Sequence, residues 1–82
     1  MIADAGFDDA FREILEDVLG WGLDLGDDDG PEQVDAWDSL AQIRIVHELE
    51  SRFGVRLPDE ALLERQSVGS LKRLVLDAAG PA

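Results

Sequence analysis

Apolar residues recur at intervals of three, four and seven in the first part of the chain, which is the spacing of one face of an α-helix. That face comprises Phe7, Phe11, Ile14, Leu15, Val18 and Leu19. Acidic residues occupy the opposite face, and Asp8 and Asp9 suit the positive N-terminal end of a helix dipole. Gly20 and Gly22 follow, and glycine commonly lies just past the end of a helix. The pattern predicts a helix over about residues 7–19.

A long loop is expected over about residues 20–38, because the helical periodicity stops there. Glycines, Pro31 and the acidic run at residues 27–29 favour turns in this stretch. Four apolar residues are expected to hold the loop against the helices: Leu23, Leu25, Val34 and Trp37. Loops of this length inside compact domains are uncommon and are usually functional. The residues to which the loop leads are therefore candidates for a functional site.

The segment after the loop again has helical spacing. Its apolar stripe comprises Leu40, Ile43, Val46, Leu49 and Phe53, with Ile45 widening it on one side. Either Asp38 or Ser39 is expected to cap this helix, with Gln42 completing a capping box three residues after Ser39. Gly54 ends the helix. The pattern therefore predicts a second long helix over residues 39–53.

Two further helices complete the pattern. Pro58 and the two acidic residues after it start a brief helix over about residues 59–64. Ser67 is expected to cap a last helix over about residues 68–79. Its inward residues are expected to be Val68, Leu71, Val75 and either Leu74 or Leu76. The sequence shows no strand-like alternation and no internal repeat. It therefore predicts an all-α fold, a small four-helix bundle with three longer helices and one short helix, as a single domain over residues 1–82.

The composition fits a small bundle with a thin aliphatic core. The 82 residues are 45% hydrophobic but only 6% aromatic, and a chain this short buries only about 60–65% of the surface that it exposes when unfolded. The sequence has no cysteine, which excludes disulfides and thiolate metal sites. No apolar run approaches the roughly 20 residues of a membrane span, and residues 1–7 lack the pattern of a secretory signal. We therefore expect a cytoplasmic protein.

Negative charge is concentrated in the first half of the chain, and the formal net charge is −12. Residues 1–41 hold 13 acidic residues and one arginine, whereas residues 42–82 hold six acidic and six basic residues. Such a field repels nucleic acid and anionic membranes and attracts basic protein surfaces. Solubility of a small protein is an equally good explanation of the acidic residues. On either explanation we expect neither nucleic acid nor a membrane as a partner.

The sequence lacks the residue patterns that a calcium-binding loop or a hydrolytic active site requires. With Gly30 as the glycine of a calcium-binding EF-hand loop, Leu25 would stand at the first ligand position and Ala36 at the twelfth, where acidic residues are required. The only histidine, His47, lies eight residues after Ser39, which along a helix is about 12 Å and too far for a hydrogen bond. We expect no metal site and no catalytic residues, and hence a protein that is not itself an enzyme.

The segment Asp38-Ser39-Leu40 resembles the Asp-Ser-Leu signature of acyl carrier and peptidyl carrier proteins. Three later segments are similar to the end of that family's second helix, to its step into a short third helix and to the start of its fourth helix. They are Glu48-Leu49-Glu50-Ser51-Arg52-Phe53-Gly54-Val55, Leu57-Pro58-Asp59-Glu60 and Ser67-Val68-Gly69-Ser70-Leu71. The resemblance keeps the order and spacing of the family over about residues 7–79, and it implies a four-helix carrier domain.

The resemblance implies that the hydroxyl of Ser39 carries 4′-phosphopantetheine. In this family a separate transferase delivers the group from coenzyme A, with magnesium held largely by that transferase. The terminal thiol then carries acyl or aminoacyl groups as thioesters, and the carrier itself catalyses none of these steps. The start of a helix suits the phosphodiester, because unpaired N–H groups and the helix dipole favour an anion there by about 0.3–1 kcal/mol.

Partner binding in this family usually involves the second helix and the loop before it. The partner-binding residues that the resemblance implies are Asp38, Leu40, Ile43, Arg44, His47 and Glu50. Ordinary core packing is an equal alternative for Ile43, and an exposed position without a role is the alternative for His47. Arg44 and His47 depart from the acidic pattern of fatty-acid carriers, which favours the loading and condensing enzymes of a polyketide, nonribosomal-peptide or related specialised pathway. We expect the carrier to be a monomer.

Two other functions stay open on the sequence. The chain is alternatively an acidic helical module for interaction or regulation, without a covalent cofactor, in which Ser39 is only a helix cap. The third alternative is a small buffer for divalent metal that uses the acidic loop.

Overall fold

The computed structural model describes residues 5–22, 24–64 and 66–79. Within these residues lie four α-helices, one 3-10 helix and no strand: α1 (Ala5–Leu19), η1 (Pro31–Gln33), α2 (Ser39–Phe53), α3 (Glu60–Leu63) and α4 (Val68–Ala79). The all-α fold expected from the sequence is therefore confirmed. Both α2 and α4 begin and end at the predicted residues, and α1 begins two residues early. The short α3 lacks one predicted residue at each end, because Asp59 and Glu64 are its cap residues.

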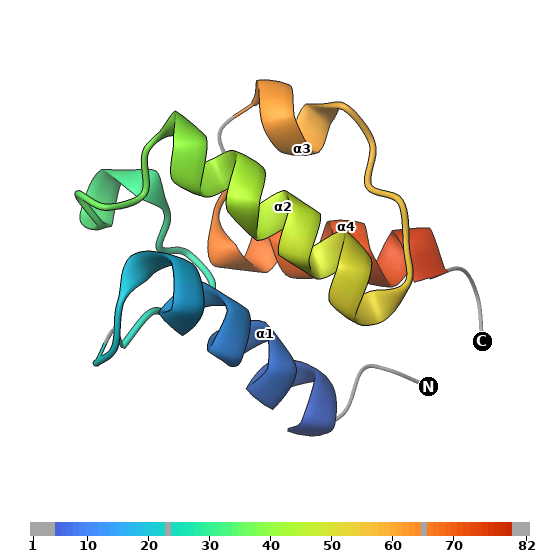
Figure 1. Ribbon diagram of the computed structural model, residues 1–82, viewed down its shortest axis with the longest axis horizontal. Coiled ribbons are helices and arrows are strands. Elements are labelled where there is room, and N and C mark those ends of the chain that lie inside the picture. Colours follow the sequence, from blue (N-terminus) through green and yellow to red (C-terminus); the bar gives the residue numbers. More distant parts are fainter. Residues whose placement is uncertain (1–4, 23, 65, 80–82) are drawn as a thin grey trace.

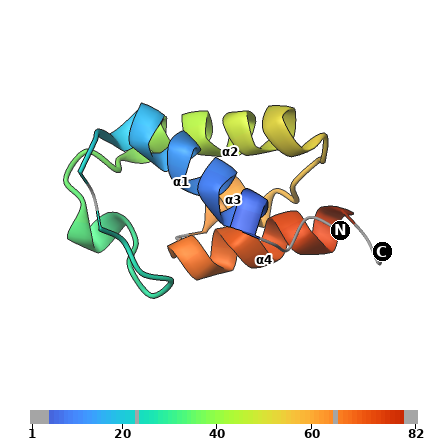
Figure 2. The same cartoon turned by 90° about the horizontal axis from the view of Figure 1, so that it is seen from below.

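The other three α-helices pack around α2, which contacts each of them. Figure 1 shows α1 and α2 side by side and running in opposite directions. After a quarter turn, α4 lies below this pair as a second layer (Figure 2). The C-terminal end of α1 and the N-terminal end of α2 consequently lie at the same end of the bundle (Figure 1). Among the described helices, none is both long and apolar enough to cross a membrane.

The core forms where the three long helices meet, and each contributes two fully buried side chains. These are Phe11 and Ile14 of α1, Ile45 and Leu49 of α2, and Leu71 and Val75 of α4. Spacing of three or four residues brings both members of each pair onto one helical face. Phe7 adds a contact between α1 and the end of α2, because its ring centroid lies 5.1 Å from that of Phe53. On α4, Val68 is buried as predicted, and both Leu74 and Leu76 pack partly buried against the core.

The buried face of α2 differs from the predicted stripe. Its buried residues are Ala41, Ile45, Val46 and Leu49. Leu40 and Ile43 are 70% and 52% exposed, so the apolar stripe of the sequence does not coincide with the buried face. At about 100° per residue, Ile43 lies roughly 200° around the helix from Ile45, which is nearly the opposite side. Because the fully buried Ile45 faces the junction of the three long helices, Leu40 and Ile43 face solvent.

Side chains hold the long loop between α1 and α2 against the helices. Val34 and Trp37 are buried and Leu25 is partly buried, as expected, whereas the predicted role of Leu23 lies outside the described residues. These contacts bury apolar surface from a segment whose acidic side chains remain largely in water. The loop is therefore a packed part of the fold and leads to the start of α2 along a fixed path.

The backbone of the same loop closes the start of α4. The N–H of Val68 donates to the carbonyl of Asp29, and the N–H of Gly69 donates to the carbonyl of Asp27, each at 2.8 Å. A Cβ atom at Gly69 would lie 3.0 Å from the Cβ atom of Asp27, so any larger residue here would push the loop outward by a few tenths of an ångström. The first two N–H groups of α4 have no acceptor within their own helix, and carbonyls of the loop accept their hydrogen bonds instead.

Candidate functional site

Asp38 is the residue that caps α2. Its Oδ1 accepts a hydrogen bond from the backbone N–H of Ala41 at 2.9 Å, while its own backbone is extended, as is usual for an N-cap residue. Ser39 is then the first residue of the helix and not its cap. Of the two capping residues that the sequence left open, the structure selects Asp38.

The predicted capping box with Gln42 is absent. The side-chain Oε1 of Gln42 accepts a hydrogen bond from the indole Nε1–H of Trp37 at 2.6 Å. Its Nε2–H donates to the carbonyl of Ala61 in α3 at 2.7 Å. A capping box needs the glutamine three residues after the cap, but Gln42 is four residues after Asp38. The prediction for Gln42 is therefore wrong, and its amide joins two other parts of the structure.

Ser39 is exposed at the first position of a helix of 15 residues. Among the described residues, none forms a hydrogen bond with its hydroxyl, and none accepts one from the backbone N–H groups of Ser39 and Leu40. The first N–H groups of a helix, together with the helix dipole, favour a bound anion. The surroundings of Ser39 therefore fit a phosphate ester on this hydroxyl.

The other three serines of the chain are placed differently. Ser67 caps α4, as predicted, because its Oγ accepts from the backbone N–H of Ser70 at 3.1 Å. The same hydroxyl donates to Oγ of Ser70 at 3.0 Å. Ser51 is exposed, but it lies in the last turn of α2, where the helix dipole favours cations. Only Ser39 is both exposed and placed at the first position of a long helix.

Trp37 anchors the segment that leads to Ser39. Its side chain is 3% exposed, and its backbone N–H donates to the carbonyl of Val34 at 2.9 Å. The indole N–H, which would be costly to bury without an acceptor, is satisfied by Gln42. The exposed hydroxyl of Ser39 therefore stands only two residues from a firmly packed aromatic ring.

Four of the partner-binding residues predicted from the sequence share one face of α2, which we name the outward stripe. They are Leu40, Ile43, Arg44 and His47, all exposed and spaced as positions i, i+3, i+4 and i+7. The exposure of Ile43 excludes the alternative that it is a core residue. Glu50 is placed differently, because it is partly buried and its Oε2 accepts from the backbone N–H of Leu57 at 2.8 Å. Asp38 likewise already uses one carboxylate oxygen to cap the helix.

The exposed leucines of α3 were missed by the sequence analysis. Leu62 and Leu63 are 48% and 81% exposed, whereas the neighbouring Ala61 is fully buried. The shortness of the segment could have indicated their exposure, because a helix of one turn buries only one side. Three consecutive apolar residues spread over about 200° of a helix, so they cannot all face the core.

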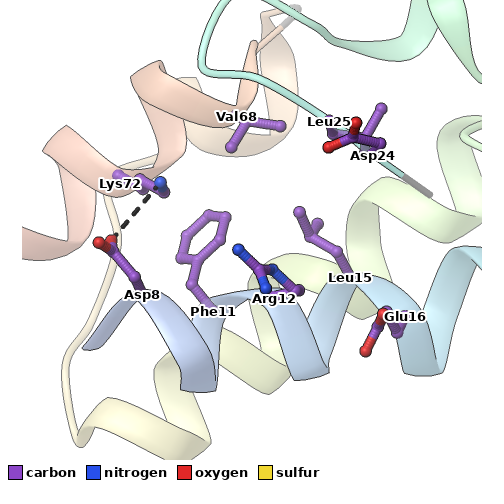
Figure 3. Close-up of a pocket in the computed structure, with 9 residues that line it drawn as sticks. All are labelled: Asp8, Phe11, Arg12, Leu15, Glu16, Asp24, Leu25, Val68 and Lys72. Atoms are coloured by element: carbon purple, nitrogen blue, oxygen red, sulfur yellow. Dashed lines mark ion pairs between the residues drawn. The ribbon is translucent and has the colours of Figure 1, made fainter. Parts of the chain in front are cut away.

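A cavity of about 250 Å³ lies elsewhere on the molecule, between α1, the loop and α4 (Figure 3). Its apolar lining includes Phe11, Leu15 and Val68. Lys72 lies at this cavity and forms an ion pair with Asp8, with Nζ 3.5 Å from Oδ1 (Figure 3). None of the lining residues belongs to α2 or α3, so the cavity is separate from the start of α2.

Two carboxylates of the acidic loop have partners within the chain. Oδ2 of Asp29 accepts from the backbone N–H of Gly26 at 2.8 Å. Oδ1 of Asp27 lies 3.1 Å from Nζ of Lys72. In the described part of the chain, no group of three or more histidine, cysteine, aspartate or glutamate residues could hold a metal ion.

Comparison with known families agrees with the geometry at Ser39. A family model described as "Phosphopantetheine attachment site" matches residues 9–75, which is most of the chain. No curated protein and no solved structure gives a significant match. The chain belongs to the phosphopantetheine-binding family of acyl and peptidyl carrier domains. Members of this family carry 4′-phosphopantetheine covalently on a serine.

Proposed function

We propose that the chain is a non-catalytic carrier protein and that the hydroxyl of Ser39 is its attachment point for 4′-phosphopantetheine. The observation that carries this proposal is the exposure of Ser39 at the first position of α2, beside N–H groups that no described residue uses. When attached, the group supplies a terminal thiol on which acyl or aminoacyl groups are held as thioesters. The chain itself supplies the position of the hydroxyl and the surface around it.

Each residue near Ser39 has a distinct part in this presentation. The backbone N–H groups of Ser39 and Leu40 stabilise the phosphate ester by about 0.3–1 kcal/mol, the usual size of an exposed interaction at a helix start. Asp38 accepts its hydrogen bond from Ala41 and so leaves those two N–H groups open. Trp37 is buried in the core at the end of the loop, and the residues after it lie at the surface, where a transferase can reach the hydroxyl.

The outward stripe is the proposed docking surface for the phosphopantetheinyl transferase and for the loading and condensing enzymes. Leu40 and Ile43 offer apolar contact area next to the attachment point. Arg44 and His47 place basic or titratable groups on the stripe of a chain whose net charge is −12. This composition departs from the acidic helix of fatty-acid carriers and favours a polyketide, nonribosomal-peptide or related pathway. Glu50 contributes less to docking, since its carboxylate is used within the chain.

The intact mass of the protein tests the proposal after incubation with coenzyme A, magnesium and a broad-specificity phosphopantetheinyl transferase. We expect the wild-type chain to gain the mass of one phosphopantetheine and Ser39→Ala to gain none. Ser51→Ala removes another exposed serine of α2 and is the matched control, which should gain the same mass as the wild type. No gain by folded wild-type protein, beside a control carrier that is modified, contradicts the proposal and favours an acidic interaction module without a covalent cofactor.

A further inference from the structure

The side-chain amide of Gln42 connects the segment before Ser39 to α3. It accepts from the indole N–H of Trp37 at 2.6 Å and donates to the carbonyl of Ala61 at 2.7 Å. An indole N–H can only donate and a backbone carbonyl can only accept, so the two partners allow one orientation of the amide. Both bonds lie in a partly buried environment, where an unpaired polar group is costly.

Such bonds matter for α3 because a helix of four residues is too short to be stable alone. Two glutamine side chains add hydrogen bonds to its carbonyls, one of which, that of Glu60, also accepts from the backbone N–H of Glu64 at 3.1 Å. Gln42 donates to the carbonyl of Ala61, and the buried Gln66 donates through Nε2 to the carbonyl of Glu60 at 2.9 Å. Beyond these bonds, the fully buried methyl group of Ala61 is the part of α3 that enters the core.

We propose that Gln42 is a positioning residue that couples α3, with its exposed leucines, to the segment that presents Ser39. The connection runs from the indole of Trp37 through the amide of Gln42 to the carbonyl of Ala61. A shift of the segment at Ser39 changes the geometry of the first bond, and the single amide passes that change to α3. The part of this proposal that concerns modified Ser39 rests on the proposed function, whereas the link between Trp37 and α3 does not.

Three substitutions test separately the bond from Trp37 to Gln42 and the bond from Gln42 to Ala61. Gln42→Leu removes both bonds and keeps a similar side-chain volume. Gln42→Glu keeps an acceptor for Trp37 but turns an oxygen toward the carbonyl of Ala61, so it breaks the bond to α3. Trp37→Phe removes the indole N–H and keeps an aromatic ring in the core. Gln33→Leu is the matched control, because Oε1 of Gln33 accepts from the N–H of Gly30 at 2.7 Å and makes no bond to α3.

Amide hydrogen exchange in the unmodified protein tests the connection. We expect Gln42→Leu and Gln42→Glu to raise the exchange rates of Leu63 and Glu64 about two- to tenfold, while the rates in α1 and α4 stay unchanged. Trp37→Phe should raise the same rates by a smaller factor, and Gln33→Leu should leave them unaltered. Unchanged rates in α3 of the Gln42 variants would overturn the proposal. So would an equal rise in all helices, which reports only lower global stability.

The amide chemical shifts of Leu62 and Leu63 provide a second readout, before and after modification of the chain. We expect modification to move these shifts in the wild type, and to move them less than half as far in Gln42→Glu at the same gain of mass. Movements of full size in Gln42→Glu would overturn the coupling. If the wild-type chain gains no mass, the proposed function fails, but the exchange rates of the unmodified protein still decide the role of Gln42.

Discussion

The helices α2 and α4 both begin beside a serine, but their first backbone N–H groups have opposite fates. At α4 the first two N–H groups donate to carbonyls of the acidic loop, and Oγ of Ser67 accepts from the backbone N–H of Ser70. At α2 the N–H groups of Ser39 and Leu40 have no acceptor among the described residues. One helix start is closed by the chain itself, and the other is left open at the surface.

The difference shows how one loop prepares a site. Its earlier part closes α4 with two backbone carbonyls, and its later part ends in buried Trp37 and the cap Asp38. An exposed helix start can remain open because water satisfies its N–H groups until an anion replaces that water. The same serine chemistry therefore gives a structural cap at α4 and an available hydroxyl at α2.

The largest expected loss of stability comes from a substitution on the buried face of α2. Ile45→Ala should destabilise the fold by about 2–5 kcal/mol, because it leaves a cavity at a fully buried position. Ile43→Ala, on the outward stripe, should change stability by less than about 0.5 kcal/mol. Urea unfolding of both variants measures the contrast, and similar losses would show that α2 buries a different face.

A smaller effect is expected from opening the closed start of α4. Gly69→Val places a side chain against Asp27 and should destabilise the fold by about 1–3 kcal/mol, the usual range for overpacking. Gly26→Val is the matched control, since a Cβ there meets its nearest atom at an ordinary 3.8 Å. The free energy of unfolding and the exchange rate of the Val68 amide report the change. A Gly69→Val chain as stable as the control would mean that the loop does not close α4.

The smallest expected effect is the difference in stability between alanine substitutions at Ser67 and at Ser39. Ser67→Ala removes a cap and should destabilise the fold by about 0.5–2 kcal/mol. Ser39→Ala removes a hydroxyl with no described partner and should alter stability by less than about 0.5 kcal/mol. Thermal unfolding of the two variants compares them directly. A larger loss for Ser39→Ala would indicate a structural role for its hydroxyl and would remove the distinction between the two helix starts.

The sequence was a good guide to the helices because their ends carry strong local signals. Gly54 ends α2 with a left-handed backbone, φ 64°, and Ser67 caps α4 through its own side chain. The rotation of α2 was harder to predict. Large apolar residues stand on both its faces, and the buried position 41 holds alanine, which periodicity counts weakly.

The position of Ser39 could be predicted from its motif, but the features that make it available are tertiary. That its N–H groups stay open depends on Asp38 taking the bond from Ala41. The role of Gln42 depends on Ala61, which lies 19 residues further along the chain. The closure of α4 depends on the carbonyls of Asp27 and Asp29, about 40 residues earlier in the chain, and a carbonyl group is common to every residue type. Single-sequence patterns report local periodicity and caps, not these long-range partners.

The location of the added group among the four serines of the modified wild-type chain tests most directly whether the open helix start is the attachment site. Proteolysis followed by fragment-ion mass spectrometry assigns the phosphopantetheine to a single residue. We expect to find it on Ser39, at the open start of α2. Its location on Ser67 or Ser70, at the closed start of α4, would contradict the claim that an open helix start defines the site.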